Sequence, residues 1–175
     1  MQRASAAEDP GLGAQADAPD SPAADSPVEL RARALRLLAR REHSRAELAR
    51  KLRPGAESAE ALERLLDELV ARRQLSDERY AEERTHWMSR KYGAARIRRD
   101  LLSKGVSAEA AARLSGASGE DDLKRARAIL VRKYRAPALN LQERAKRARF
   151  LQARGFSFDV IRRLLREAPG GPAGE

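Results

Sequence analysis

Histidine and carboxylate side chains are the groups with which this chain could carry out acid–base or metal chemistry. His43 and His86 are its only histidines, and cysteine is absent, which excludes disulfides and thiolate chemistry. Neither histidine stands in a metal-ligand spacing such as HExxH. We expect His43 to be a cation at the end of a helix, where the helix dipole favours positive charge.

The remaining candidates for chemistry have ordinary structural explanations. Most carboxylates stand at expected helix starts or at helical spacing from an arginine, where caps and surface ion pairs account for them. The stretches RPGAES and SGASGE contain glycine but lack the phosphate-loop pattern and a preceding strand. The sequence therefore predicts no catalytic residue, no cofactor, no metal site and no enzymatic activity.

Positive charge is the strongest chemical signal in the sequence. The 175 residues carry a net charge of +10. Residues 1–27 contain one arginine and five acidic residues and so carry −4, and Glu175 is the only charge after residue 167, which leaves +15 on residues 28–167. A body this basic indicates a polyanionic partner, most often nucleic acid or a nucleoprotein.

Compositional bias is the competing explanation for this charge. Only six of the 36 basic residues are lysine, and a chain rich in alanine and arginine often reflects a GC-rich genome. Such a bias explains why arginine is used in place of lysine. It does not explain the excess of bases over acids.

Aromatic side chains could add base stacking to this charge. Trp87 and Tyr92 share a helical stripe with Met88, which favours core packing for both rings. For Tyr80 the sequence leaves both interpretations open.

Hydropathy and composition set the context of the fold. No apolar run approaches the roughly 20 residues that span a bilayer, and the acidic N-terminus lacks the apolar centre of a signal peptide. We therefore expect a cytoplasmic protein without a membrane partner. Residues 1–27 and 168–175 contain almost no large apolar side chains, so we expect both segments to be disordered.

Helix signals fill the chain between these tails. Capping boxes are expected at Ser26–Glu29, Ser44–Glu47 and Asn140–Glu143. Further caps are expected at Ser58, Ser76, Ser107, Ser118 and Ser157, and helix stops at Gly55, Gly105 and Gly155. No segment alternates with the period of a strand, so the predicted fold is all-α. The predicted helices cover residues 27–41, 45–52, 59–72, 77–91, 94–104, 108–114, 119–134, 141–154 and 158–167.

These helices form three triplets, each with a long, a middle and a closing helix. The stretch LLSKGVSAEA at 101–110 and the stretch LQARGFSFDV at 151–160 share the pattern Leu-x-x-x-Gly-x-Ser between middle and closing helix. A lone triplet would have a thin core, so stacking is expected. We predict an elongated, curved array of three tandem three-helix repeats, at 28–75, 76–116 and 117–167. Arg135 stands where the second repeat has Gly93, so the third repeat is expected to leave its first helix differently.

Four stretches resemble the RecX family of RecA regulators. They are ALRLLARREHSRAELARKL (34–52), LDELVARRQLSDERYAEE (66–83), RKYGAARIRRDLLSKGVS (90–107) and VRKYRAPALNLQERAKRARFLQARGFSFDVI (131–161). The resemblance implies three stacked three-helix repeats without enzymatic activity. It also implies a protein that lies in the groove of a RecA–DNA filament and inhibits the recombinase and its ATPase. The acidic residues 1–27 lie outside the family pattern.

The leading hypothesis is thus a monomeric RecA modulator whose basic concave face contacts the filament and its single- or double-stranded DNA, directly or through RecA. The expected contact residues are Arg40, Arg41 and Arg45 in the first repeat, Arg90, Lys91, Arg96, Arg98 and Arg99 in the second, and Arg132, Lys133 and Arg154 in the third. The main alternative is a helix-turn-helix-like protein that binds DNA directly through its closing helices. A scaffold that binds only acidic proteins is the third interpretation.

Overall fold

The protein is all-helical in the residues described by the computed structural model, which are 24–116, 119–134, 136, 138 and 140–167. The first triplet contains α1 (Pro27–Leu38), α2 (Arg45–Leu52), a 3₁₀ turn (Arg53–Gly55) and α3 (Ala59–Ala71). The second contains α4 (Asp77–Ser89), α5 (Ala94–Ser103) and α6 (Ala108–Leu114), and the third α7 (Gly119–Lys133), α8 (Leu141–Gln152) and α9 (Phe158–Glu167). None of the described helices combines the length and apolar character that a membrane span requires.

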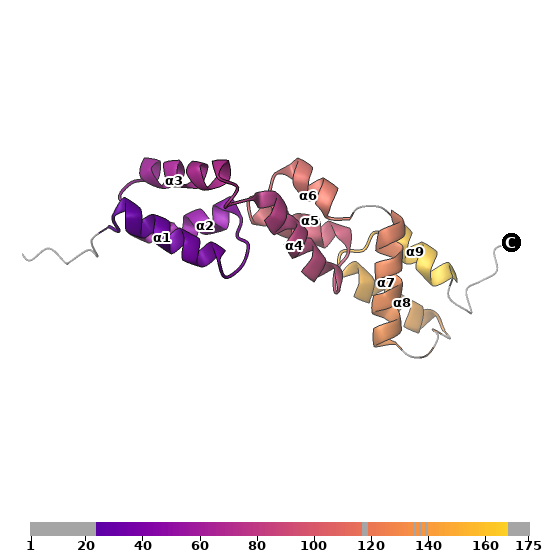
Figure 1. Cartoon of the computed structure of the whole chain (residues 1–175). Coiled ribbons are helices and arrows are strands. Elements are labelled where there is room, and N and C mark those ends of the chain that lie inside the picture. The colour runs from indigo at the N-terminus through magenta and orange to yellow at the C-terminus, as the bar shows by residue number, and fades with distance from the viewer. Residues whose placement is uncertain (1–23, 117–118, 135, 137, 139, 168–175) are drawn as a thin grey trace, which may run out of the picture.

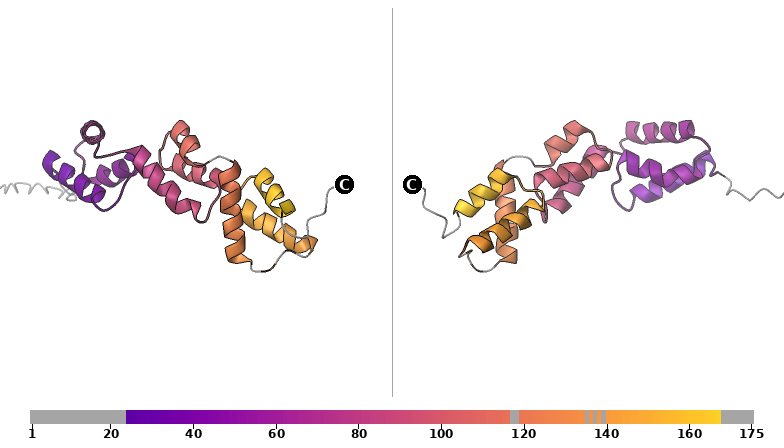
Figure 2. Two further views of the ribbon diagram at one scale, coloured as in Figure 1. Left: turned by 45° about the vertical axis from the view of Figure 1, so that its right-hand side comes forward. Right: turned by 180° about the vertical axis from the view of Figure 1, so that it is seen from behind.

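The three triplets follow one another in an elongated row that bends at the third (Figures 1 and 2). Each triplet has its own apolar core. The first is built around Leu48, Leu52, Leu66 and Leu69, the second around Ala81, Ile97 and Leu101, and the third around Leu123, Ala126 and Leu151. The prediction of an all-α array of three-helix repeats is confirmed.

The helix ends agree with the predicted caps in most places. Ser26 and Glu29 form a complete capping box, and Asn140 accepts from the N–H of Glu143. Ser44 also caps its helix, but the Glu47 carboxylate reaches Arg41. The predictions for Ser118, Arg135 and the tails at residues 1–23 and 168–175 lie outside the described residues.

The first helix is shorter than predicted, and His43 is buried beyond its end. The helix ends at Leu38, not at residue 41. The side chain of His43 is 1% exposed, and its Nδ1 lies 2.9 Å from the carbonyl oxygen of Arg41. The Lys51 ammonium donates to Nε2 at 3.0 Å, which leaves Nδ1 as the protonated nitrogen. Burial lowers the pKa of His43, so the expectation of a cationic histidine is wrong.

The two Leu-x-x-x-Gly-x-Ser joints have the predicted geometry. Gly105 and Gly155 both have φ of +82°, the left-handed conformation that side chains resist. Val106 and Phe156, which follow them, are buried. Gly55 differs, because it ends the 3₁₀ turn without a positive φ.

Each joint also contacts the preceding triplet. The carbonyl oxygen of Lys104, before Gly105, accepts from the Ser44 hydroxyl at 2.6 Å. In the next junction the carbonyl oxygen of Arg154, before Gly155, accepts from the backbone N–H of Gly93 at 2.9 Å. The joint therefore links the middle and closing helices of one triplet and also forms a hydrogen bond with the preceding triplet.

A carboxylate completes both junctions in the same way. Asp77 at the start of α4 accepts from the N–H of Arg45, the first residue of α2, at 2.6 Å. Asp122 in α7 accepts from the N–H of Ala94, the first residue of α5, at 3.1 Å. Because a helix N-terminus has unpaired donors and a positive dipole end, each carboxylate stabilises the middle helix of the preceding triplet.

Candidate functional site

A basic groove lies on the second triplet, where the end of α4 meets one face of α5. It has a volume of about 850 Å³. Arg96, Arg99 and Ser103 line it from α5 at spacings of three and four residues, which place them on one helix face. The other basic side chains along it are Arg84, Arg90 and Lys91, and its aromatic side chains are Trp87 and Tyr92.

Most of the positive charge in this groove has no carboxylate partner among the described residues. Arg84 pairs with Asp100 through two hydrogen bonds of 2.8 and 3.0 Å, and the hydrogen bond to Asp100 raises the pKa of Arg84. The other four basic side chains form no ion pair with a carboxylate in the part of the chain that the structure describes. The groove is therefore a place where an anionic partner gains charge pairing without breaking an internal ion pair.

Cations lie over aromatic rings along this surface. The Arg90 guanidinium is 5.0 Å from the centroid of the Trp87 ring. That of Arg96 is 4.3 Å from the Tyr92 ring. In the third triplet, Lys133 and Arg154 lie 4.9 and 3.9 Å from the Phe150 ring. Such contacts hold flexible basic side chains in place while leaving their charge unpaired.

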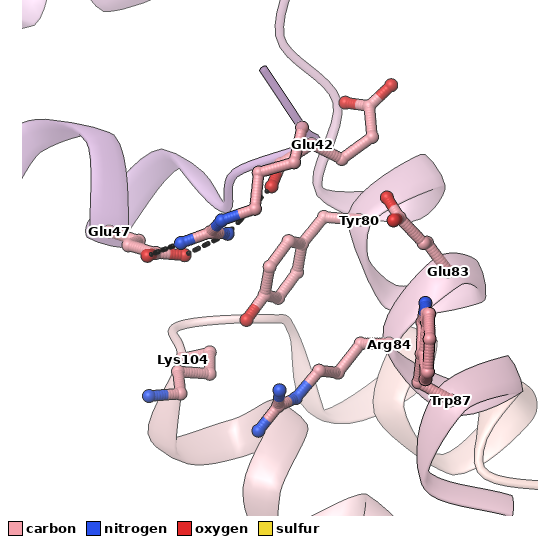
Figure 3. A pocket seen from close by; sticks show the side chains of 8 residues that line it. Glu42, Glu47, Tyr80, Glu83, Arg84, Trp87 and Lys104 are labelled. Atoms are coloured by element: carbon pink, nitrogen blue, oxygen red, sulfur yellow. Dashed lines mark hydrogen bonds and ion pairs between the residues drawn. The ribbon is translucent and has the colours of Figure 1, made fainter. Parts of the chain in front are cut away.

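Trp87 does not belong to the core, contrary to the prediction from its stripe. Its side chain is 61% exposed, whereas Tyr80 is 5% exposed. Both residues lie on α4 seven positions apart, so they share a helix face. Tyr80 belongs to the core of the second triplet with Ala81 and Met88, and both rings line the hollow that faces the first triplet (Figure 3). Hydrophobic spacing could not show which of the two rings the core of the triplet buries.

A second hollow of about 470 Å³ lies between the first two triplets (Figure 3). Glu42, Glu47 and Glu83 line it together with Arg41 and Lys104. Arg41 donates to Glu47 at 2.5 Å, which lowers the pKa of Glu47 to about 2 and raises that of Arg41. Arg84 and Trp87 line both this hollow and the basic groove.

The eleven predicted contact residues fall into different environments. Arg90, Lys91, Arg96 and Arg99 line the groove together. Arg132 lies beside them, because it donates to the carbonyl oxygen of Arg90 at 2.7 Å. Arg154 contacts Gly93 through its backbone carbonyl oxygen, and its guanidinium lies over the Phe150 ring. Lys133 belongs to the Phe150 cluster of the third triplet.

The others lie apart from this groove. Arg45 pairs with Glu63 and Asp67 at 2.5 and 2.8 Å, and Arg41 with Glu47. Arg40 is exposed in the turn after α1, and Arg98 is exposed on α5 without lining the groove. Sequence reasoning missed Arg84 and the exposed Trp87. The arginine-rich sequence around the end of α4 was the feature that could have indicated Arg84.

Fold and groove together define a helical-repeat protein that presents a positively charged surface with an exposed aromatic side chain. No cluster of three or more histidine or acidic side chains suited to a metal ion occurs among the described residues. Models of the first, second and third three-helix domains of RecX match residues 31–69, 76–113 and 120–165. The chain belongs to the RecX family of regulatory proteins.

Individual relatives agree with this assignment. The regulatory protein RecX of Leptothrix cholodnii is 45% identical over 141 residues, covering 81% of this chain and 90% of that protein. That of Ralstonia nicotianae is 42% identical over 142 residues, covering 81% and 89%. The crystal structure of RecX from Lactobacillus salivarius, at 21% identity, has the same fold, with a TM-score of 0.68 over 81% of this chain and 95% of that one.

Proposed function

We propose that this protein regulates the RecA recombinase as a non-enzymatic inhibitor. It binds in the groove of the RecA–DNA filament as a monomer and suppresses recombinase and ATPase activity. The name of its relatives, regulatory protein RecX, supports the regulatory role. The resemblance to that family implies RecA as the target and inhibition as the effect.

The observation that carries the proposal is the unpaired positive charge on the second triplet. Four basic side chains line one groove without carboxylate partners among the described residues. Arg132 adds a fifth from the third triplet next to Arg90. An elongated protein with such a surface suits a long polyanionic partner, because several charges engage along its length.

Direct recognition of a DNA major groove by the closing helices is the alternative function, and the ion pairs argue against it. Arg113 is the only basic residue of α6, and it pairs with Glu78 at 2.9 Å. On α9, Arg162 pairs with Asp159, and Arg163 pairs with Glu120 at 2.9 Å. A recognition helix needs such side chains free for base edges.

The test is the ATPase activity of RecA on single-stranded DNA, titrated with this protein. Inhibition at well below one molecule per RecA protomer is expected, since blocking filament growth needs few molecules. Absence of any effect at equimolar and excess protein would contradict the proposal. Nanomolar, sequence-specific binding to labelled duplex DNA without RecA would favour the alternative.

A further inference from the structure

We propose that the basic groove binds unpaired nucleotides and that Trp87 stacks on one of their bases. This inference deepens the proposed function and rests on it for the setting in which such nucleotides are met. It names single-stranded nucleic acid as the ligand class and separates a base-contacting residue from the phosphate-contacting ones.

The position of Trp87 is the first support. Its indole is the only one in the chain, and it is 61% exposed on the wall of the groove. Every nucleobase offers a flat π-face, so an exposed aromatic ring next to cations binds single strands without sequence preference. In duplex DNA the bases are stacked on each other and do not offer those faces.

The distribution of charge around Trp87 is the second support. On one side lie Arg90, Lys91 and Arg99 without carboxylate partners among the described residues. On the other side the neighbouring hollow is lined by three acidic residues, Glu42, Glu47 and Glu83, and three basic ones, Arg41, Arg84 and Lys104 (Figure 3). The charge of the hollow is therefore balanced while that of the groove is mostly positive, so phosphates are attracted to the groove side of the indole.

The size of the groove is the third support. A volume of about 850 Å³ is in the range of small-ligand pockets, roughly 300–1,000 Å³. This space suits a short stretch of one strand. The Arg90 guanidinium lies over one face of the indole, so the base stacks on the opposite face, with that charge behind the ring.

Trp87 also supplies the measurement, because its fluorescence comes from the site alone. The full chain is titrated at low salt with a 15-nucleotide oligothymidine, an abasic strand of equal length and a 15-base-pair duplex. Quenching of the indole fluorescence by the oligothymidine is expected, with little quenching by the abasic strand or the duplex.

Substitution of Trp87 separates stacking from charge. In anisotropy titrations with end-labelled strands, Trp87→Ala is expected to weaken oligothymidine binding about 5- to 140-fold. It should change abasic-strand and duplex binding by less than about twofold, because the phosphate contacts remain. Trp87→Phe should lie between Trp87→Ala and the unsubstituted protein, and Lys91→Glu with Arg99→Glu should weaken all three ligands. Circular dichroism checks that each variant keeps its helix content.

Three results would overturn the inference. They are equal losses for oligothymidine and abasic strand in Trp87→Ala, unquenched fluorescence at saturation, and absence of oligothymidine binding. If RecA ATPase inhibition persists in any of these cases, the proposed function stands and only the stacking site is rejected. Stacking without any effect on RecA would reject the proposed function and keep the site.

Discussion

Gly155 lies directly against Arg96, across the junction of the second and third triplets. A Cβ on Gly155 would fall 2.5 Å from the Arg96 Cβ and 2.7 Å from its backbone nitrogen. The side chain of Arg96 crosses the same junction and donates to the carbonyl oxygen of Ala153 at 3.1 Å. Gly155, which forms the turn between α8 and α9, thus also lies against the start of α5, the helix that lines the basic groove.

Gly155→Ala is expected to be strongly destabilising. The left-handed conformation alone costs about 1–2 kcal/mol for a residue with a Cβ. The added methyl group would also meet backbone, which cannot turn aside as a side chain can. Urea unfolding followed by circular dichroism should show a lower free energy of unfolding by at least about 2 kcal/mol. A variant that unfolds like the unsubstituted protein would contradict the junction contact.

Gly105→Ala tests the equivalent joint of the second triplet. Part of the stability that it loses should be restored by a second substitution. The added Cβ would lie 2.6 Å from the Ala46 Cβ, with the Ala46 Cα 4.0 Å away. Ala46→Gly therefore removes the collision but not the backbone strain. In a double-mutant cycle we expect a favourable coupling of about 0.5–3 kcal/mol. Zero coupling would show that the two residues do not meet.

Charge reversal in the groove should weaken inhibition of RecA. Lys91→Glu with Arg99→Glu removes two cations that have no ion-pair partner among the described residues, so the fold is expected to be retained. We expect the concentration for half-maximal inhibition of the ATPase to rise about tenfold or more, with a weaker dependence on salt.

A matched control is available for this pair. Arg50→Glu with Lys124→Glu makes the same change in net charge at exposed positions that neither line the groove nor belong to the expected contact residues. Inhibition close to that of the unsubstituted protein is expected. An equal loss in this control would show that overall charge acts, and not the groove.

The Glu47–Arg41 pair should make the first junction sensitive to strong acid. Because Arg41 lowers the pKa of Glu47 from 4.5 to about 2, the folded protein holds this carboxylate ionised where the unfolded chain protonates it. The stabilisation is complete above about pH 4.5 and is lost as the pH falls toward 2. The stability of Glu47→Gln, followed by circular dichroism during acid unfolding, should depend less steeply on pH in this window than that of the unsubstituted protein.

Protonation of His43 should lower the free energy of unfolding at a higher pH than protonation of Glu47 does. Its pKa is lowered from 6.5 by burial, and Arg41 and Lys51 oppose its protonation while Glu47 favours it. The unfolded chain therefore binds a proton near pH 6.5 that the folded protein resists, so stability decreases as the pH falls below that value. The free energy of unfolding of His43→Gln, measured in urea at pH 7 and pH 5, should change less than that of the unsubstituted protein. An equal change would contradict the buried neutral histidine.

Local signals in the sequence determined the helices, their caps and the joints. Ser26 and Glu29 form their box because capping involves residues three positions apart, which the sequence displays directly. Gly105 and Gly155 turn with positive φ because only glycine takes that conformation without strain. The basic character of residues 28–167 is likewise a property of composition.

Only the tertiary structure decided which basic side chains are available and which aromatic ring is exposed. Arg45 and Arg99 are alike in the sequence, but α3 brings Glu63 and Asp67 to Arg45, and no described carboxylate pairs with Arg99. Trp87 and Tyr80 share a helix face, yet only Tyr80 is buried, in the core of the second triplet. Ion pairing and burial depend on neighbours distant in the chain, and periodicity within one helix carries no information about them.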